Sequence, residues 1–281
     1  CYLQTRKGNT ACEQFDYLDA SVPTMAKVMK SAGYTTGHFG KWHMGGGRDV
    51  IDAPQITEYG FDEYISTWES PNPDPVITDS AWIWSRTDQV KRWDRTAYLD
   101  KTLDFLKRHK GEPCFVNLWP DDMHTPWVPS QKTMDSERTS WTTPPNFKEV
   151  LTEYDKQIGR LMEGLTKLGL EKNTIVIFTS DNGPAPSFQQ MRTNSLLGVK
   201  CSLYEGGIRM PFAIHWPEKI KAGGINDSSI VCAVDLLPSL CALTGAKLPL
   251  DMELSGEDMS RALLGEPQIR KKDLMWDFGR N

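Results

Sequence analysis

The chain has 281 residues, enough for one large hydrophobic core or for a main domain with a smaller appendage. Hydrophobic residues make up 39% of it, and no apolar run approaches the roughly 18 residues that span a bilayer. The net charge of −5 argues against a general nucleic-acid binder. We therefore expect neither a membrane nor a nucleic acid as partner, and a bound anion would need a local positive cluster.

The start of the sequence and its cysteines carry limited information. Six cysteines show no C-x-x-C spacing and are too sparse to define a disulfide scaffold. The sequence begins at Cys1 without an initiator methionine or a signal segment. We therefore expect the chain to be part of a longer one.

Helical and strand patterns alternate along most of the chain, which favours an α/β sheet covered by helices. In the first repeat of this pattern, Ser21 is expected to cap a helix that stops at Gly33. Residues 34–39 are then expected to form a strand that leads directly to Lys41.

The second helix and strand follow the same order. A helix is expected over residues 95–110, and the apolar residues 113–119 are typical of a buried strand. This strand leads to Asp121, Asp122 and His124.

The third helix and strand have the clearest pattern. Apolar residues share one helical face over residues 151–168, and the β-branched residues 174–179 predict a buried strand. Asp181 and Asn182 follow at a glycine turn.

Further along, residues 211–216 are expected to form another apolar strand and residues 235–243 a helix. Segments at about 49–93 and 130–147 are rich in Trp, Pro, Asp, Ser and Thr, and are interpreted as loop-rich insertions.

Each polar cluster thus follows a predicted strand. In open α/β sheets, ligands bind beyond the carboxyl ends of the strands. We therefore expect the clusters around Lys41, His124 and Asp181 to converge although they are far apart in the sequence.

The segment 40–45 reads G-K-W-H-M-G. If it is extended, Lys41 and His43 point to one side and Trp42 to the other. A lysine beside a histidine suits an anionic, oxygen-rich group that is held and then protonated or deprotonated. The alternative is an ordinary exposed turn.

The remaining polar residues also have two interpretations each. Asp181 and Asn182 offer oxygen ligands for Ca²⁺ or Mg²⁺, although Asp-Asn-Gly is also a common turn. His124 suits a general acid or simply caps loop backbone. Lys200 is a candidate cation or a solvated side chain, whereas Glu205 and Arg209 suggest an internal ion pair.

Three other histidines are left outside the candidate site. His38 lies within a predicted strand near the expected pocket, and His109 closes a helix where a cation suits the dipole. His215 lies in a strand that is expected to belong to the core.

The ordered motifs together resemble the formylglycine-dependent sulfatases over about residues 20–265. They are G-Y-T-T at 33–36, G-K-W-H-M-G at 40–45, H-T-P at 124–126, S-D-N-G-P at 180–184, Lys200, and E-G-G-I-R-M-P at 205–211. The resemblance implies an alkaline-phosphatase-like α/β fold, a mixed sheet sandwiched by helices. Residues 1–281 are then an N-terminally truncated part of the catalytic domain, with the smaller C-terminal domain mostly absent.

The resemblance also assigns roles to four catalytic residues. Lys41 looks like the lysine that binds a sulfate oxygen and the nucleophile, and Lys200 like the second lysine on sulfate. His43 looks like the histidine that hydrogen-bonds the formylglycine hydrate, and His124 like the acid that protonates the leaving alcohol.

Asp181 and Asn182 match two ligands of the family's divalent metal, usually Ca²⁺. The family's nucleophile comes from a Cys or Ser in C/S-x-P/A-x-R, and no such motif occurs in the 281 residues. We therefore expect the formylglycine upstream of this chain, and no activity from these 281 residues by themselves.

The expected reaction is hydrolysis of sulfate esters in a secreted, periplasmic or lysosomal protein. Sulfated carbohydrate is favoured over a small aryl sulfate, because tryptophans near the predicted loops suit stacking on sugar rings. A phosphodiesterase or phosphonate hydrolase of the same superfamily, and a non-catalytic binder of sulfated glycans, remain alternatives. The oligomeric state is not predicted.

Overall fold

The computed structural model describes residues 5–47, 49–66, 96–125, 127–130, 132, 143–250 and 252–277. The chain forms two compact units. Unit 1 comprises Cys1–Gly164 and Ala246–Met252, and unit 2 comprises Leu165–Gly245 and Glu253–Asn281. Among the described residues, no helix is both long and apolar enough to cross a membrane.

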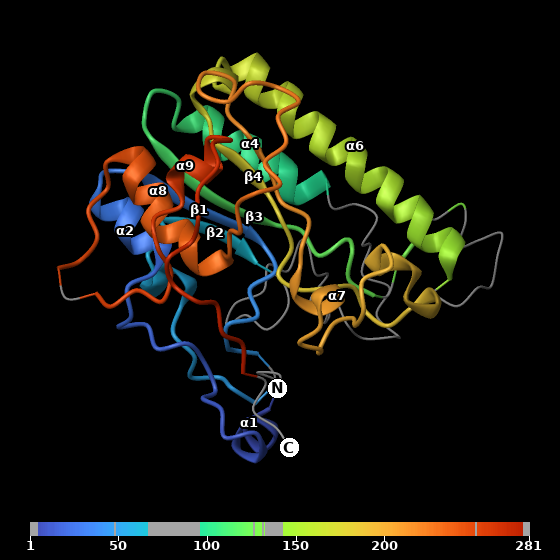
Figure 1. Cartoon of the computed structure of the whole chain (residues 1–281). Coiled ribbons are helices and arrows are strands. Elements are labelled where there is room, and N and C mark those ends of the chain that lie inside the picture. The colour runs from blue at the N-terminus through green and yellow to red at the C-terminus, as the bar shows by residue number, and fades with distance from the viewer. Residues whose placement is uncertain are drawn as a thin grey trace. The chain divides into compact units, whose positions relative to one another are not determined.

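Helices and strands alternate along much of the chain (Figure 1). The helices are α1 (Arg6–Ala11), α2 (Met25–Ser31), α4 (Thr96–Arg108), α6 (Pro144–Leu168), α7 (Glu205–Ile208), α8 (Leu236–Thr244) and α9 (Ser260–Leu263). The strands are β1 (Thr35–Gly40), β2 (Glu63–Ser66), β3 (Cys114–Trp119), β4 (Val176–Phe178) and β5 (Ala213–His215). Short 3₁₀ helices cover Ile56–Tyr59, Glu171–Asn173, Phe188–Thr193 and Ala233–Asp235.

The sheet of unit 1 is parallel, with the strand order β2-β1-β3. At its carboxyl edge, Gly40 pairs with both Ser66 and Trp119. The central strand β1 is buried from its second residue onward because it has a neighbour on each side. The two strands predicted over residues 34–39 and 113–119 are therefore confirmed, and they are neighbours.

Helices cover both faces of this sheet. On the α2 side, the buried residues of one cluster are Ala26, Trp42, Ile56, Tyr59 and Phe61. On the α4 side, a second cluster comprises Phe39, Tyr98 and Phe105. Tyr64 packs on the first cluster and its neighbour Ile65 on the second, as expected because successive side chains of a strand point to opposite faces. The sandwich predicted for the sheet is present in unit 1.

Helix α2 starts later than predicted. Its N-cap is Thr24, whose Oγ1 accepts a hydrogen bond from the Lys27 N–H at 3.1 Å. Ser21 does not cap the helix, because its N–H donates to the Asp19 carboxylate at 2.8 Å in the preceding turn. Gly33 follows the helix in the left-handed region, with φ of 88°.

The segment predicted as an insertion at 49–93 is not all loop. Within its described part, Ile56–Tyr59 form a 3₁₀ helix and Glu63–Ser66 form strand β2 of the sheet. Ile56 and Tyr59 are fully buried, so apolar side chains spaced along this polar segment hold it against the core. Residues 67–93 lie outside the described residues.

The second predicted insertion, at 130–147, overlaps the beginning of helix α6. This helix begins at Pro144, whereas the apolar pattern predicted a start at residue 151. Two prolines fit there because the first turn of a helix needs no backbone N–H donor. Thr143 precedes the helix and its carbonyl accepts from the Phe147 N–H at 3.0 Å. Residues 131 and 133–142 lie outside the described residues.

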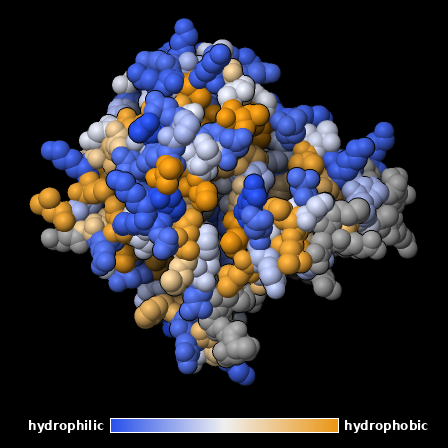
Figure 2. Space-filling model, in the orientation of Figure 1, coloured by the Kyte–Doolittle hydropathy of each residue, from blue (hydrophilic) through white to orange (hydrophobic). Residues whose placement is uncertain are grey.

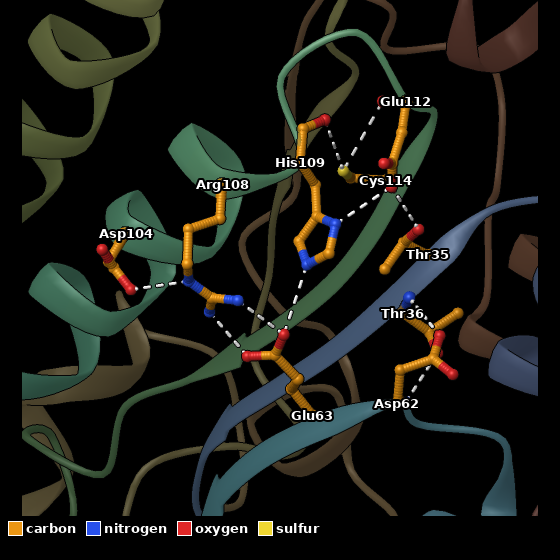
Figure 3. Close-up of polar contacts among 9 residues, drawn as sticks. All are labelled: Thr35, Thr36, Asp62, Glu63, Asp104, Arg108, His109, Glu112 and Cys114. Carbon is orange, nitrogen blue, oxygen red and sulfur yellow. Dashed lines mark hydrogen bonds and ion pairs between the residues drawn. The ribbon is translucent and has the colours of Figure 1, made fainter.

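A charged network ties the amino ends of β1 and β2 to the C-terminal end of α4 (Figure 3). Arg108 donates to both carboxylate oxygens of Glu63, at 2.7 and 2.6 Å. The His109 ring nitrogens lie 3.2 Å from Glu63 and 2.9 Å from Glu112. The Thr35 hydroxyl also donates to Glu112, at 2.9 Å. Because both ring nitrogens of His109 face carboxylates, Glu63 first and Glu112 second, its pKa is raised.

Unit 2 contains the antiparallel pair β4 and β5, in which Ile177 faces Ile214. The strands predicted over 174–179 and 211–216 are confirmed in shorter form, but their predicted burial is wrong. Phe178 is 42% exposed, and Ala213 and His215 are exposed as well. Among the described residues, these two strands pair only with each other, which leaves their side chains less covered. Parallel and antiparallel pairing therefore occur in two separate sheets.

The predicted burial of strand β3 is also only partly correct. Its first five residues are half-buried, and Trp119 is 41% exposed. β3 has one strand neighbour among the described residues, β1, and so forms an edge of that sheet. Figure 2 shows the result at the surface level, where apolar residues stand among hydrophilic ones.

A buried ion pair fastens the C-terminal segment of unit 2. The Arg270 guanidinium donates to both carboxylate oxygens of Asp235, just before helix α8. Asp235 also accepts from the N–H groups of Cys232 and Glu257, at 2.8 and 3.0 Å. Burial would raise the pKa of Asp235, but Arg270 and these two N–H groups together lower it. The helix predicted over 235–243 is confirmed, and it ends at Gly245 as expected.

Arg270→Leu is expected to destabilise unit 2 strongly. Asp235 is fully buried and would lose its charged partner, which typically costs about 3–5 kcal/mol. Urea unfolding followed by circular dichroism measures the loss. Arg261→Leu is the matched control, because its pair with Glu266 is exposed and worth at most about 1 kcal/mol. Equal losses from both variants would contradict the assignment.

The His109 network makes the stability of unit 1 depend on pH. A group whose pKa is raised by folding stabilises fully below its unfolded pKa of about 6.5, and this contribution is lost as pH rises through the folded value. His109→Gln should therefore lower Tm relative to wild type more at about pH 5.5 than at about pH 8.5. Differential scanning calorimetry measures both, with exposed His215→Gln as control. A Tm difference that grows at high pH would have the wrong sign.

Candidate active site

Lys41 directly follows the central strand, and its backbone is fixed at the edge of the sheet. Its N–H donates to the Trp119 carbonyl at 2.9 Å. The preceding Gly40 has φ of 124°, and a Cβ there would lie 2.1 Å from the same carbonyl oxygen. Only glycine fits this close approach. The sequence therefore places Lys41 where β1 and β3 end together.

The carbonyl of Lys41 has a partner that the sequence analysis left outside the site. Nε2 of His38 lies 3.1 Å from the Lys41 carbonyl oxygen, and the His38 side chain is fully buried. Burial lowers the pKa of His38 to about 4, outweighing the backbone carbonyls of Lys41 and Gly40 that favour the charged ring. The available signal was a titratable residue in the middle of an apolar, central strand.

The extended geometry expected for the Lys41–His43 segment is wrong. Strand β1 ends at Gly40, and His43 has φ of 52°, a left-handed conformation unusual for a residue with a side chain. Trp42 is buried, whereas Lys41 and His43 are half-buried. The turn is secured further along, where the Leu18 N–H donates to the Met44 carbonyl at 3.0 Å. Backbone strain of this kind is concentrated at functional sites.

His124 lies in a turn after β3. Its N–H donates to the Asp121 carbonyl at 3.0 Å, and its Nδ1 lies 2.8 Å from the Thr125 carbonyl oxygen. Because that oxygen only accepts, Nδ1 is the protonated nitrogen of the neutral ring. Lys41 and His124 therefore follow the carboxyl ends of neighbouring parallel strands. The predicted convergence holds for these two clusters.

Asp181 and Asn182 follow strand β4 in a turn of unit 2. The Asn182 side-chain amide donates to the Gly183 carbonyl at 2.8 Å, which orients the amide group. The Ser180 hydroxyl donates to the Asn182 carbonyl at 3.1 Å. Asp181 is exposed and Asn182 half-buried. The turn that was the alternative interpretation of this motif is present, and it presents two oxygen-bearing side chains.

Lys200 belongs to the same loop cluster because two glycine-rich segments interlock. The Lys200 N–H donates to the Pro184 carbonyl, and the Gly183 N–H donates to the Gly207 carbonyl, both at 2.9 Å. A Cβ on Gly183 would lie 2.0 Å from the carbonyl oxygen of Gly206. The glycines thus allow backbone to pack on backbone, and this contact brings Lys200 beside the turn of residues 180–184.

The predicted pair of Glu205 and Arg209 is confirmed. Arg209 Nη1 lies 3.1 Å from Glu205 Oε1, across the short helix α7. Both side chains are exposed, so the ion pair contributes at most about 1 kcal/mol. Its structural interpretation stands.

The donor set for a metal ion fits in chemistry. A carboxylate and an amide oxygen on Asp181 and Asn182 are the hard ligands that Ca²⁺ and Mg²⁺ prefer. In the part of the chain that the structure describes, no group of three or more His, Cys, Asp or Glu side chains is placed to hold a metal. Asp181 and Asn182 thus match part of a shell, since Ca²⁺ takes about six to eight oxygens.

The candidate residues thus form two sets. Lys41, His43 and His124 lie at the carboxyl edge of the parallel sheet of unit 1, and Lys200, Asp181 and Asn182 lie in the interlocked loops of unit 2. Both sets follow strands of an α/β protein and carry cations, imidazoles and hard oxygen ligands, which suits the handling of an anionic ester.

Comparison with known proteins identifies the family. The sulfatase family model matches residues 2–246, which is most of the chain and includes all six candidate residues. The chain belongs to the sulfatase family.

Several relatives show the same relationship. The chain is 26% identical to an N-acetylgalactosamine-6-O-sulfatase of Bacteroides thetaiotaomicron, over 89% of this chain and 61% of the relative. It is 28% identical to an ulvan-active sulfatase of Formosa agariphila, over 92% of this chain and 53% of the relative. A crystal structure of Ps i-CgsB with k-i-k-neocarrahexaose matches with a TM-score of 0.69 at 25% identity, over 89% of this chain and 60% of that one.

These comparisons confirm the predicted fold class. The solved neighbours are sulfatases with the alkaline-phosphatase-like fold, and the helix-covered parallel sheet of unit 1 agrees with it. The chain spans about three-fifths of the length of the first relative and about half of the second.

Gly183→Ala tests the interlocked loops of unit 2. The added methyl group would meet the Gly206 carbonyl oxygen at 2.0 Å, so we expect a loss of about 1–3 kcal/mol in the free energy of unfolding, measured by urea titration. Gly159→Ala in helix α6 is the matched control, because its Cβ meets no atom within 4 Å. That variant should stabilise by about 0.5–1 kcal/mol. A neutral Gly183→Ala would contradict the close contact.

Proposed function

We propose that the whole protein containing this chain hydrolyses sulfate esters of carbohydrates. The observation that carries the proposal is the match of the sulfatase family model over residues 2–246, with all six candidate residues inside it. The structure supports it by placing Lys41 and His124 after neighbouring parallel strands.

The substrate class rests on the relatives. One is an N-acetylgalactosamine-6-O-sulfatase and another an ulvan-active sulfatase, and a solved neighbour is in complex with a neocarrahexaose. A sulfated sugar is therefore proposed over a small aryl sulfate. The particular sugar and the position of its sulfate are left to the substrate screen.

Lys41 and Lys200 are proposed to bind the sulfuryl oxygens. An ammonium group offers up to three N–H donors and a full positive charge to oxygens that gain negative charge in the transition state. Both lysines start from fixed backbone, since each donates its N–H to a carbonyl at 2.9 Å. The proposal brings the two onto one sulfate group.

His124 is proposed to protonate the leaving sugar hydroxyl. Its Nδ1 is engaged by the Thr125 carbonyl at 2.8 Å, so Nε2 is the nitrogen that gives up a proton from the charged ring. His43 is proposed to hydrogen-bond the attacking nucleophile. Its strained backbone sets the direction of the ring beside Lys41.

Asp181 and Asn182 are proposed to hold a divalent cation, Ca²⁺ or Mg²⁺. In this family a bound cation neutralises charge on the sulfuryl group, and a formylglycine supplies the nucleophile. No residue of the 281 fits the nucleophile motif, so both the formylglycine and the remaining metal ligands are proposed to lie outside this chain. A secreted, periplasmic or lysosomal location is part of the same proposal.

The test compares two kinds of sulfate ester with the whole protein in the presence of Ca²⁺. General acid catalysis contributes about 10²- to 10⁴-fold, and most to a leaving group of high pKa. His124→Ala should therefore cut kcat/KM on a sulfated sugar at least about 100-fold, and on 4-nitrophenyl sulfate much less. The matched control is His215→Ala, an exposed histidine on β5 that lies outside the candidate residues.

Three results would contradict the proposal. Hydrolysis of phosphate diesters without sulfate-ester turnover would assign the protein to a phosphodiesterase. Binding of sulfated glycans without any turnover would make it a lectin-like relative. Equal losses on both sulfate esters in His124→Ala would remove the role of His124 as acid.

A further inference from the structure

We propose that His38 is a positioning residue that holds Lys41 in place through its backbone carbonyl. The inference rests on the sulfate-binding role proposed for Lys41 and adds a residue to that site. His38 touches no substrate in this proposal, because it is fully buried within the sheet. It acts on the peptide that joins Lys41 to Trp42.

The ring of His38 is held rigidly by aromatic neighbours. Its centroid lies 5.1 Å from the rings of Trp42 and Trp119, both nearly perpendicular to it, and 5.3 Å from the ring of Phe61. Edge-to-face contacts of this kind are favourable and fix the ring orientation. The ring is therefore unable to swing away from Lys41 without displacing the core.

One polar contact leaves this aromatic enclosure. Nε2 of His38 lies 3.1 Å from the Lys41 carbonyl oxygen, and since that oxygen only accepts, Nε2 is the donor. Nδ1 is buried and has no hydrogen-bond partner among the residues that the structure describes. A leucine or methionine would fill the space more cheaply, so a buried imidazole here points to the hydrogen bond that Nε2 makes.

The backbone of Lys41 is then clamped on both sides. Its N–H donates to the Trp119 carbonyl at 2.9 Å, and its carbonyl accepts from His38. Both orientations matter because the chain leaves the sheet here and turns into the left-handed conformation of His43. A freed carbonyl would let the peptide rotate, and with it the base of the lysine side chain.

The test uses three variants of the whole protein and of this chain. His38→Gln keeps an amide N–H near the position of Nε2, and His38→Met fills similar space without a donor. Thr36→Val is the matched control on the same face of β1. It removes a buried hydrogen bond from Oγ1 to the Gly60 carbonyl, 2.7 Å long, but lies at the other end of the strand.

The first measurement is hydrogen exchange of the Trp42 amide, which belongs to the same peptide as the Lys41 carbonyl. We expect faster exchange in His38→Met than in wild type, near-normal exchange in His38→Gln, and no change in Thr36→Val. This readout requires no catalysis, so it tests the positioning even if the whole protein hydrolyses no sulfate ester.

The second measurement is turnover of a sulfate ester at temperatures where all variants are folded. His38→Met should lower kcat/KM about tenfold and weaken inhibition by inorganic sulfate in parallel, since losing such a supporting contact typically costs about 10- to 100-fold. His38→Gln should recover most of the loss, and Thr36→Val should keep full activity at a similar loss of Tm.

Two outcomes would overturn the proposal. If His38→Met exchanges and turns over like wild type, the hydrogen bond does not hold Lys41. If His38→Gln is as impaired as His38→Met in both measurements, the ring is needed for packing alone. Absence of sulfate-ester turnover in every form would instead overturn the proposed function, while the exchange result still decides the role of His38.

Discussion

The arrangement of unit 1 depends on one backbone contact, where Gly40 packs on the carbonyl of Trp119. Strand β1 lies between β2 and β3 in a parallel sheet, so its last residue has backbone on both sides. No side chain fits between Gly40 and that carbonyl, which at the same point accepts the N–H of Lys41. The end of the central strand is thereby fixed to its neighbour, and the lysine, the strained His43 turn and the loop carrying His124 are all placed from this edge.

Unit 2 reaches a similar result with glycines in loops instead of strands. Gly183 and Gly206 approach so closely that their backbones exclude any side chain, and the Lys200 N–H completes the contact through the Pro184 carbonyl. Backbone contacts of this kind are directional and lose little side-chain entropy. Both units therefore hold flexible lysine side chains on rigid starting points. The ion pair of Arg270 with Asp235 secures the same unit elsewhere, by closing its C-terminal segment onto helix α8.

Much of the fold was predictable where apolar periodicity was strong. The strand expected over 34–39 is β1 within one residue, and the helix expected over 151–168 ends where α6 ends. Strand β2 was missed because four residues in a polar segment carry no decisive pattern, and their pairing with β1 is a tertiary effect. The exposure of β4 was missed for a related reason, since a β-branched run does not reveal how many neighbours a strand has.

The candidate site shows the same division. Motifs in the sequence named Lys41, His43, His124, Lys200, Asp181 and Asn182, but the hydrogen bond of His38 to a backbone carbonyl leaves no trace in residue spacing. The most direct test of the account is a crystal structure of the whole protein with inorganic sulfate. We predict sulfate oxygens about 3 Å from Nζ of both Lys41 and Lys200. Sulfate bound away from either lysine would contradict the account.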